Sequence, residues 1–501
     1  MVAQVGTVAL LGFEGAIVEV ETDIKQGLPA MHIVGMGNKA IDEARERVRS
    51  ALNNSLLDFP TRKVIVNLAP AELPKDGAHF DLPIALSIMV ASGQLQQRDI
   101  IGSAFAGELS LGGELRPIRG ALVIAEAAKK AGYVKVFVPL ASAAQASLIE
   151  GIDVIAASTL KEVFLHLKNE TPIPPSTPQR IIESPSHSIT IDDIHGQDQA
   201  KRALQIAAAG RHNILLCGPP GAGKTMLAKA LISLLPPLSK PESLSVTKIH
   251  SIAGELEDVI TTRPFRTPHH TTSSIALIGG GAKARPGEIS LAHLGVLFLD
   301  ELPEYPRNTL EALRQPLEDQ TITISRAGSR VMYPADFMLV ATMNPCPCGY
   351  YGDSTKECTC SSVQILAYQK RLSGPLLDRI DLVITVSKVN YKQLLSQNTL
   401  KELQHPKVFE HIMSAVSEQK SRYNSSQKYN ASLTSKDVKA MLQLSPEARK
   451  LLLTASEQLN LTARSYFKVI KVAQTIADLE SAPIIQVHHI AEALQFRANP
   501  S

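Results

Sequence analysis

The segment NILLCGPPGAGKT, which runs from Asn213 to Thr225, decides the fold of the region around it. A short apolar run leads into a glycine-rich turn with the spacing Gly218-x-x-x-x-Gly223-Lys224-Thr225. Glycines let such a turn wrap so that successive backbone N–H groups converge on phosphate oxygens. The run MLAKALISLL that follows predicts a helix whose positive end faces the same anion. The segment therefore predicts a strand, a phosphate-binding loop and a helix in succession.

The side chains at the end of this loop have predicted tasks. Lys224 is expected to reach the β- and γ-phosphates of a bound nucleotide, ATP, and the Thr225 hydroxyl is expected to bind Mg²⁺. The residues of the loop predicted to contact the nucleotide are Gly218, Pro219, Pro220, Gly221, Ala222, Gly223, Lys224, Thr225 and Met226.

A second segment, Val296 to Glu301, is an apolar run that ends in two carboxylates. It predicts a strand followed by a Walker B pair. Asp300 would hold the water shell of Mg²⁺, and Glu301 would polarise the water that attacks the γ-phosphate. A buried strand that runs into a solvated acidic loop has the same pattern, but the phosphate loop upstream favours the catalytic interpretation.

Length and composition bound the remaining possibilities. A chain of 501 residues is too long for one hydrophobic core and suggests about three domains. The formal net charge of +3 is too small to indicate nucleic-acid binding by itself, so any basic surface must be local. No apolar run approaches the roughly 20 residues that cross a bilayer. Four of the five cysteines fall between Cys346 and Cys360, unlike a disulfide framework. We expect a cytoplasmic protein without a membrane partner.

Residues 1–168 alternate short β-rich runs with helical stretches, which predicts an α/β domain. The segments LPKDGAHFDLPIALS (73–87) and AGELSLGGELRPIRGALVIAEAAKKAG (106–132) resemble the proteolytic domain of Lon proteases, which has the fold of ribosomal S5 domain 2. In this resemblance His79 stands where a Lon protease has its serine nucleophile, and Leu122 stands at the place of its lysine. A Ser-Lys pair needs a hydroxyl and an amine within reach, so we expect the fold without proteolysis. A repurposed site of Lys75, Asp76 and His79 is the alternative to a plain surface loop.

The segment 169–190 is rich in Pro and Ser and predicts a linker. It divides the Lon-like part from a predicted ATPase core at 191–388 and a C-terminal helical lid at 389–501.

From Asp192 onward the chain resembles the AAA+ module of the magnesium-chelatase-like group, and specifically the YifB/ComM family. The segments that carry this resemblance are Gly196-Gln197, 218–225, RPFRTPHHTTS (263–273), GGGAKARPGEISLAHLGVLFLDELPEY (279–305), ATMNPCPCGYYGD (341–353) and RLSGPLLDRID (371–381). With the Lon-like front end and the helical tail, the resemblance covers nearly the whole chain. It implies nucleotide contacts at Gly196 and Gln197 and assembly as a homo-hexameric ring.

Three further residues have predicted catalytic roles. Asn344 ends the apolar run 336–343 and is placed to orient the attacking water as a sensor. Arg379 would reach the γ-phosphate of the neighbouring subunit as an arginine finger. The alternative for Arg379 is a salt bridge to Asp378 or Asp381, and Arg371 is a weaker candidate for the same role.

Arg464 matches the second sensor arginine of AAA+ lids and is expected to touch nucleotide. It lies near the start of a long predicted helix. In that helix the apolar residues Phe467, Ile470, Ala473 and Ala477 repeat on one face. Ser445-Pro446-Glu447 predicts the start of another lid helix, with a capping side chain and proline at the first position.

The segment TITISRAGSRVMYP predicts a β-hairpin with a basic tip, flanked by Arg326 and Arg330. In AAA+ helicases that resemble this chain, such a hairpin lines the central pore and touches nucleic-acid backbone. The stretch from about 247 to 290, with Lys283 and Arg285, would be the other pore-facing insertion. Phosphate contacts need only a cation at the right radius. These four residues are therefore candidate DNA contacts, although basic hairpin tips are often merely solvated.

Cys346, Cys348, Cys358 and Cys360 form a C-x-C-x9-C-x-C pattern. Four thiolates paired in this way can close a tetrahedral Zn²⁺ site of structural type. The alternative is a set of free buried thiols. Cys217 is expected to belong to the strand core.

The resemblance implies an ATP- and Mg²⁺-dependent DNA motor, a helicase or branch-migration factor that aids integration of transforming DNA, with recombination proteins as candidate partners. A chelatase-like motor that remodels protein partners without binding DNA is the alternative. An ATP-dependent protease is a third reading, which His79 and Leu122 at the dyad positions disfavour.

Overall fold

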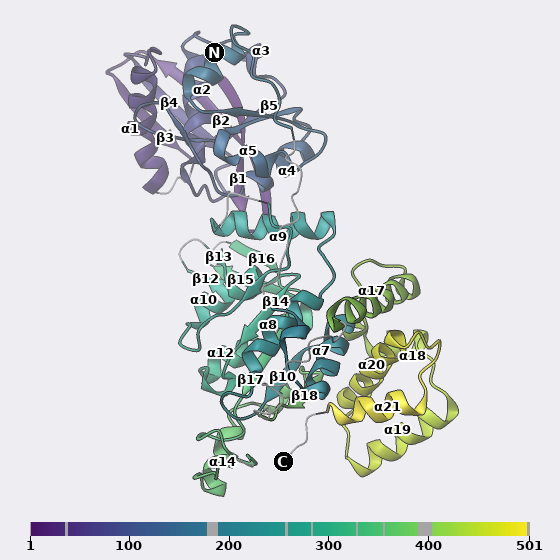
Figure 1. Ribbon diagram of the computed structural model, residues 1–501. Coiled ribbons are helices and arrows are strands. Elements are labelled where there is room, and N and C mark those ends of the chain that lie inside the picture. Colours follow the sequence, from purple (N-terminus) through teal and green to yellow (C-terminus); the bar gives the residue numbers. More distant parts are fainter. Residues whose placement is uncertain are drawn as a thin grey trace.

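The computed structural model describes residues 2–35, 39–177, 189–255, 259–281, 284–326, 329–353, 356–388 and 403–497. Figure 1 shows an N-terminal α/β part stacked on a central α/β part, with a C-terminal helical part beside the central one. The predicted combination of two α/β regions and a helical tail is confirmed at this level. Of the predicted linker, the described residues include Ser176, whose backbone N–H bonds to the Val154 carbonyl of the N-terminal part.

The N-terminal part is built on a mixed seven-stranded sheet with the order β3-β4-β2-β1-β5-β8-β9. Its strand β4 has the sequence KVIVNLA, in which every second residue is buried, as expected for a strand with one covered face. Helix α2 is apolar nearly all round and is buried in the main core of this part. The strands are β1 (Ala3–Leu11), β2 (Glu14–Lys25), β3 (Ala30–Val34), β4 (Lys63–Ala69), β5 (Ser103–Phe105), β8 (Lys135–Pro139) and β9 (Asp153–Ala157), with a separate pair β6 (Glu108–Leu109) and β7 (Leu115–Arg116). The helices are α1 (Lys39–Asn54), α2 (Asp81–Ala91), α3 (Gln97–Ile100), α4 (Ala121–Lys130), α5 (Ala143–Ala146) and α6 (Leu160–Leu167).

The central part contains a five-stranded sheet, all parallel, with the order β11-β14-β17-β10-β18. Both predicted strands are confirmed, as β10 (Ile214–Cys217) and β14 (Val296–Leu299), and the other strands are β11 (Phe265–Arg266), β17 (Met338–Met343) and β18 (Leu382–Thr385). The residues of the inner strands β14 and β17 are buried throughout, as expected for a parallel sheet covered on both faces. One face shares a core with α7 (Asp198–Gly210) and α8 (Lys224–Leu234). The other face packs on the segments between the strands, α11 (Glu288–Leu291), α12 (Arg307–Ala312), α13 (Pro316–Asp319), α14 (Ser362–Gln369) and α15 (Gly374–Leu377).

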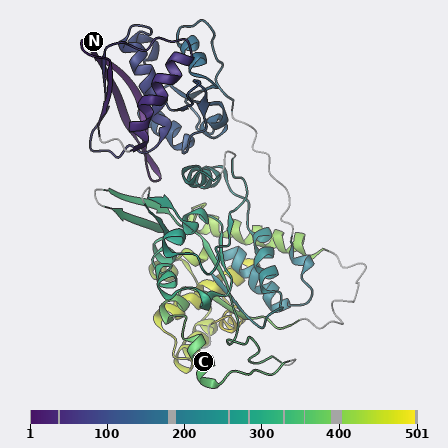
Figure 2. The same cartoon turned by 90° about the vertical axis from the view of Figure 1, so that its left-hand side faces the viewer.

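Two small hairpins project from the central part toward the N-terminal part (Figure 2). The predicted basic hairpin is confirmed as β15 (Thr321–Arg326) paired with β16 (Ser329–Pro334). Beside it lie α10 (Ser274–Ile278) and the pair β12 (Gly279–Gly280) and β13 (Arg285–Pro286). The Tyr333 hydroxyl donates a hydrogen bond to the Ala284 carbonyl at 2.9 Å, which joins the two hairpins.

Helix α9 (Lys240–Ala253) lies between the N-terminal and central parts (Figure 1). Lys248 Nζ donates to Glu126 of α4 at 2.6 Å, and the backbone N–H of Gly120 donates to Ser251 Oγ at 3.1 Å. The stretch expected to face a pore begins at about residue 247, so its first residues belong to this junction. Residues 247–253 form the last turns of the helix that joins the two parts.

The C-terminal part consists of α17 (Gln404–Tyr423), α18 (Ser435–Met441), α19 (Pro446–Gln458), α20 (Ala463–Leu479) and α21 (Val487–Gln495). The predicted start at Ser445 is confirmed, because its side chain accepts a hydrogen bond from the Ala448 N–H. A buried histidine fastens this part to the central sheet. His212 Nε2 lies 2.8 Å from Thr475 Oγ1 of α20, and Nδ1 lies 3.3 Å from Asp381.

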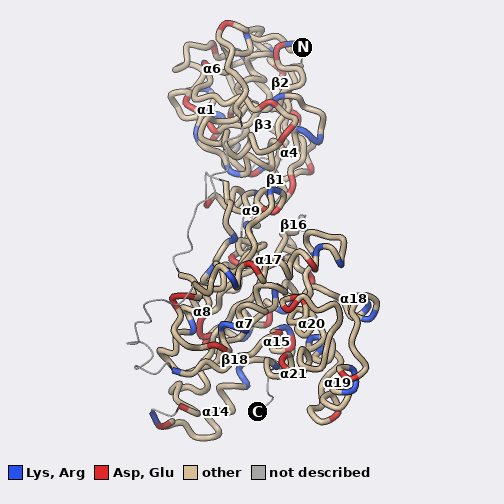
Figure 3. Tube along the Cα trace, turned by 45° about the vertical axis from the view of Figure 1, so that its right-hand side comes forward, with Lys and Arg blue, Asp and Glu red and all other residues tan. Residues whose placement is uncertain are grey.

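Lysine and arginine alternate with aspartate and glutamate over all three parts of the molecule (Figure 3). The small net charge thus reflects mixing rather than two opposed surfaces. Among the described helices, none combines the length and the apolar character that crossing a bilayer requires.

Candidate nucleotide site

The candidate site lies at the carboxyl edge of the five-stranded sheet. Because the strands are parallel, their carboxyl ends meet at one edge. Gly218 follows β10, Asp300 follows β14 and Asn344 follows β17, so three segments far apart in sequence come together there.

Lys224 links the loop to the predicted sensor. Its Nζ donates to the carbonyls of Gly218 at 2.5 Å and Pro219 at 3.1 Å, and to Asn344 Oδ1 at 3.0 Å. Burial lowers the pKa of Lys224, while nearby acidic groups, including Asp300, oppose that shift. The lysine is thus held by neutral oxygens at the position where an anionic group would compete for it.

Thr342, which the sequence analysis missed, orients the Walker B pair. Its hydroxyl donates to Asp300 Oδ1 at 2.5 Å and accepts from the Glu301 N–H at 2.9 Å. Glu301 has a φ of +52°, in the left-handed region that a glutamate seldom adopts. Such backbone conformations recur at functional sites. The available clue in sequence was a hydroxyl two residues before Asn344, in a run that is otherwise apolar.

The remaining predicted nucleotide residues frame this edge. Thr225 lies exposed in the first turn of α8, directly after Lys224. The side chain of Gln197 donates to the Ser387 carbonyl, beyond the end of β18, and Gly196 precedes it with a φ of +63°. The Thr225 hydroxyl and the Asp300 carboxylate are hard oxygen donors, which suit Mg²⁺.

The four predicted cysteines converge beside the phosphate loop. The Sγ atoms of Cys346, Cys348 and Cys358 lie 3.4 to 3.6 Å from one another, and all four Sγ atoms lie within 4.8 Å. Four thiolates around one Zn²⁺ at about 2.3 Å would be separated by about 3.8 Å. The cluster could therefore hold a metal ion. Backbone N–H groups of Cys348 and Tyr351 point at sulfur atoms of the cluster, as is favourable for thiolates.

The loop that these cysteines brace touches the nucleotide edge. A Cβ atom at Gly349 would lie 2.6 Å from Pro220, so only glycine fits against the phosphate loop there. The side chain of Gln369 on α14 donates to the Pro345 carbonyl at 3.3 Å. Cys217 lies apart from the cluster, partly buried against the core on one face of the sheet.

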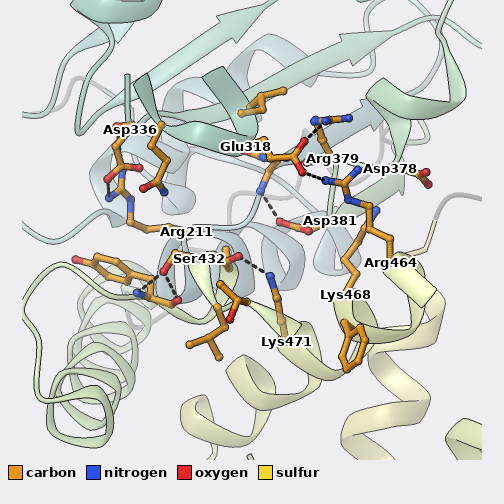
Figure 4. A pocket seen from close by; sticks show the side chains of 18 of the residues that line it. Arg211, Glu318, Asp336, Asp378, Arg379, Asp381, Ser432, Arg464, Lys468 and Lys471 are labelled. Carbon is orange, nitrogen blue, oxygen red and sulfur yellow. Dashed lines mark hydrogen bonds and ion pairs between the residues drawn. The ribbon is translucent and has the colours of Figure 1, made fainter. Parts of the chain in front are cut away.

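Arg379 and Arg464 lie at the opposite, amino edge of the same sheet (Figure 4). They line a cavity of about 600 Å³ between the central and C-terminal parts, together with Asn213, which precedes β10. Arg379 does not pair with Asp378 or Asp381 as the alternative interpretation expected. Its ion-pair partner is Glu318 on α13, and its Nη1 donates to the Pro375 carbonyl four residues earlier.

Arg464 binds the same Glu318 at 2.9 Å. It therefore lies beside Arg379 and not beside the phosphate loop of its own chain, contrary to what a lid arginine acting on its own nucleotide would require. The reason is the placement of α20, which packs over the amino ends of the strands.

Two further cations of this cavity were missed by the sequence analysis. Lys468 lies four residues after Arg464, and Lys471 lies three residues after Lys468. This spacing places all three side chains on one face of α20 (Figure 4). Lys468 Nζ donates to the Ile380 carbonyl at 2.6 Å, and Lys471 Nζ donates to the Ala431 carbonyl at 3.0 Å. Burial lowers the pKa of both lysines. The spacing itself was the clue that could have revealed them.

Arg371 lies at the carboxyl edge instead. It pairs with Glu304 at 2.9 Å, three residues after Glu301, and its side chain is about half exposed.

Two of the four predicted DNA contacts have described side chains. Arg330 on β16 and Arg285 on β13 are exposed. Lys283 and the side chain of Arg326 lie outside the described residues.

The residues at the Lon-like dyad positions are engaged with their own chain. His79 is buried and its Nε2 lies 2.9 Å from the Val8 carbonyl, while Leu122 is buried in α4. Burial lowers the pKa of His79 to about 4, so the ring is neutral near pH 7. Lys75 Nζ bonds to the Pro70 carbonyl. His79 and Asp76 line a cavity of about 470 Å³ at the junction with the hairpins.

Comparison with known proteins gives consistent matches along the chain. Family profiles described as "Magnesium chelatase, subunit ChlI", "Subunit ChlI of Mg-chelatase" and "Magnesium chelatase, subunit ChlI C-terminal" match residues 190–394, 20–142 and 404–497. The uncharacterized protein YifB of Escherichia coli is 42% identical over 500 residues, which cover 99% of this chain and 96% of that protein. Competence protein ComM of Haemophilus influenzae is 41% identical over 496 residues, 98% of this chain and 96% of that protein. The magnesium-chelatase 67 kDa subunit of Chlorobaculum parvum is 29% identical over 164 residues, which cover 31% of this chain and 23% of that protein.

Proposed function

Because this chain belongs to the magnesium-chelatase-like YifB/ComM family, we propose that it is an AAA+ ATPase that assembles as a ring, a homo-hexamer, and moves on DNA. The observation that carries the proposal is the placement of two half-sites on opposite edges of one sheet. Lys224, Asp300, Glu301 and Asn344 lie at the carboxyl edge, while Arg379 lies at the amino edge. A head-to-tail ring brings unlike edges of identical subunits together.

In the proposed reaction a water molecule attacks the γ-phosphate of ATP in line with the leaving group. Glu301 accepts the proton of this water, and Asn344 orients it. Lys224 leaves the carbonyls of its own loop and binds the phosphates. Arg379 of the neighbouring subunit neutralises the charge that develops in the transition state. Mg²⁺, when bound by Thr225 and Asp300, adds positive charge at the phosphates.

We propose that Cys346, Cys348, Cys358 and Cys360 bind one structural Zn²⁺. The short Sγ separations and the N–H groups directed at sulfur support this proposal. A metal there would hold the segment after Asn344 against the phosphate loop.

We propose that the motor moves on DNA because exposed basic residues lie on two neighbouring hairpins. Arg330 and Arg285 come from neighbouring hairpins that the Tyr333 hydroxyl joins. A relative with 41% identity is named a competence protein, which supports a role in handling transforming DNA alongside recombination proteins.

The test is ATP hydrolysis with and without single-stranded DNA, measured for the wild type, Glu301→Gln and Arg326→Ala/Arg330→Ala. A general base contributes about 10² to 10⁴ in rate, so Glu301→Gln should lose hydrolysis by that factor. The hairpin variant should keep basal hydrolysis and lose stimulation by DNA.

A matched control is Arg314→Ala, which removes a partly exposed arginine of the central part that pairs with Glu311. It should retain both activities. Absence of DNA stimulation at low salt, with Glu301→Gln inactive, would leave an ATPase and favour a motor that remodels protein partners.

A further inference from the structure

Two arginines with separate predicted tasks converge on one carboxylate in the amino-edge cavity (Figure 4). Glu318 accepts a hydrogen bond from Arg464 Nη2 through one oxygen at 2.9 Å, and from Arg379 Nη2 through the other. Glu318 is 61 residues from Arg379 and 146 residues from Arg464 along the chain. The fold, and not local sequence, therefore brings the three side chains together.

The two arginines are held to different degrees. The Arg379 side chain is only 10% exposed, and its Nη1 also donates to the Pro375 carbonyl at 2.7 Å. The side chains of Glu318 and Arg464 are 52% and 43% exposed. The open side of the cluster thus consists of the carboxylate and Arg464, with Arg379 behind them.

The carboxylate does not satisfy Arg379 completely. Arg379 Nε is buried and has no hydrogen-bond partner among the described residues. An unsatisfied buried donor is unfavourable, and a carboxylate has only two oxygens, both of which already face these arginines. A phosphoryl group offers three oxygens and more negative charge, so it can accept from both arginines and still reach a further donor.

Glu318 is an anion in the resting chain. Burial by itself would raise the pKa of Glu318, but the adjacent Arg379 and Arg464 outweigh it, and the net pKa lies below the usual value. The two arginines therefore already grip a negative charge before any nucleotide arrives.

We propose that Glu318 is a positioning residue that occupies the place of the neighbouring subunit's γ-phosphate, holds Arg379 and Arg464 side by side, and releases them when that phosphate arrives. This inference rests on the proposed function, because the replacing phosphate comes from ATP bound to a second copy of the chain. Ion pairs as exposed as that of Arg464 are weak, which makes the exchange feasible.

A direct consequence concerns the free chain. Without the carboxylate, both guanidinium groups should react faster with phenylglyoxal, an arginine-specific reagent. Labelling followed by mass spectrometry in the absence of nucleotide should show a roughly three- to tenfold faster reaction of Arg379 and Arg464 in Glu318→Gln, as expected for loss of one or two exposed ion pairs. Glu311→Gln, which removes a partly exposed carboxylate paired with Arg314, is the matched control and should leave both rates unchanged.

A second consequence concerns assembly. Glu318→Gln removes a competitor of the γ-phosphate, so subunits should associate in a non-hydrolysable ATP analogue at roughly three- to tenfold lower protein concentration than the wild type. In an Arg379→Ala/Arg464→Ala background the same substitution should have no effect, because Glu318 is proposed to act only through these arginines.

The outcomes distinguish the positioning role of Glu318 from the role of the two arginines at a neighbouring subunit. Equal labelling in wild type and Glu318→Gln, or an assembly shift that persists without the arginines, overturns the positioning role alone. If the ATP analogue protects neither arginine from phenylglyoxal in the wild type, the arginines do not meet a neighbour's phosphate. That result overturns the exchange together with the trans-acting part of the proposed function.

Discussion

The two edges of the five-stranded sheet carry opposite chemistry. At the carboxyl edge Lys224 donates to backbone carbonyls and to the Asn344 amide oxygen, and Thr342 joins Asp300 to the backbone of Glu301. At the amino edge Arg379, Arg464, Lys468 and Lys471 line one cavity and are held by Glu318 and by backbone carbonyls. The carboxyl edge is suited to bind a nucleotide and to activate the attacking water. The amino edge is suited to neutralise phosphate charge. In the proposed ring these two edges would form complementary halves of one site, each contributed by a different subunit.

The largest expected effect breaks this complementarity at the amino edge. Arg379→Ala should lower ATP hydrolysis by about 10³ to 10⁵, because an arginine finger stabilises the transition state by that factor. Mixing it with Lys224→Ala, which is inactive at the other edge, should restore about a quarter of wild-type activity, since random mixing pairs intact edges at about one interface in four. Hydrolysis rates of the separate and mixed proteins check this expectation. If the mixture is as inactive as its components, Arg379 does not act between subunits.

A smaller effect is expected at the carboxyl edge. Thr342→Val keeps the side-chain volume but removes the hydroxyl that bonds to Asp300 and Glu301. A hydrogen bond to a charged group is worth about 1.5 to 3 kcal/mol, so kcat should fall by about 10- to 100-fold with little change in KM. Thr385→Val, at the exposed end of β18 on the same edge, is the control and should stay close to wild type. A Thr342→Val enzyme with unchanged kcat would show that the Walker B pair does not need this support.

Measuring the metal content tests whether the cysteine cluster at the carboxyl edge binds zinc. The purified protein should contain one zinc per chain, and Cys346→Ser should lose it. We expect thermal unfolding of the central part to shift down by roughly 4 °C, about the effect of 1 kcal/mol. Cys217→Ala, outside the cluster, should keep the metal. A metal-free wild type prepared without chelators would favour the interpretation as free thiols.

The last expected effect is a pH dependence of stability that arises at the amino edge. Burial lowers the pKa of His293 to about 4, and its Nδ1 accepts the Asp336 N–H at 3.1 Å, a bond that protonation would abolish. The unfolded chain takes up this proton near pH 6.5 and the folded chain only near pH 4. The histidine therefore lowers stability as the pH falls from 6.5 to 4, by at most about 1.4 kcal/mol per pH unit.

Thermal midpoints of the wild type and His293→Asn between pH 4 and 7 test this sign. The variant should be less stable at pH 7 and should lose less stability on acidification. His411→Asn, on the exposed side of α17, should follow the wild-type slope. Parallel slopes for wild type and His293→Asn would contradict the assignment.

Much of the carboxyl edge could be predicted because its residues lie in short continuous segments of sequence. The phosphate loop with its flanking strand and helix, and VLFLDE with its buried strand, each contain the residues and the local structure that position them. The cap at Ser445 and the pairing of β15 with β16 are local in the same sense. Thr342 was not predicted because its role depends on which strand lies next to β14. That strand is β17, in which Thr342 lies 42 positions after Asp300.

The amino edge could not be predicted in this way. Arg379 was expected to act as an arginine finger, with a salt bridge to an adjacent aspartate as the alternative. Within the chain it instead binds Glu318, at a separation of 61 residues. The sequence of helix α9 does not reveal its partner, and only the fold shows that it joins the N-terminal and central parts through Lys248 and Ser251.

The phosphate loop, the acidic pair at a strand end and the four clustered cysteines could be read from the sequence. Backbone conformation and residue chemistry over a few positions are enough to predict each of them. Only the tertiary structure decided that Arg464 lies with Arg379 and away from Lys224, and that Glu318 holds both arginines. The physical reason is that the packing of α20 against α7 and α17 is set by buried area contributed by distant parts of the chain, which no short segment encodes.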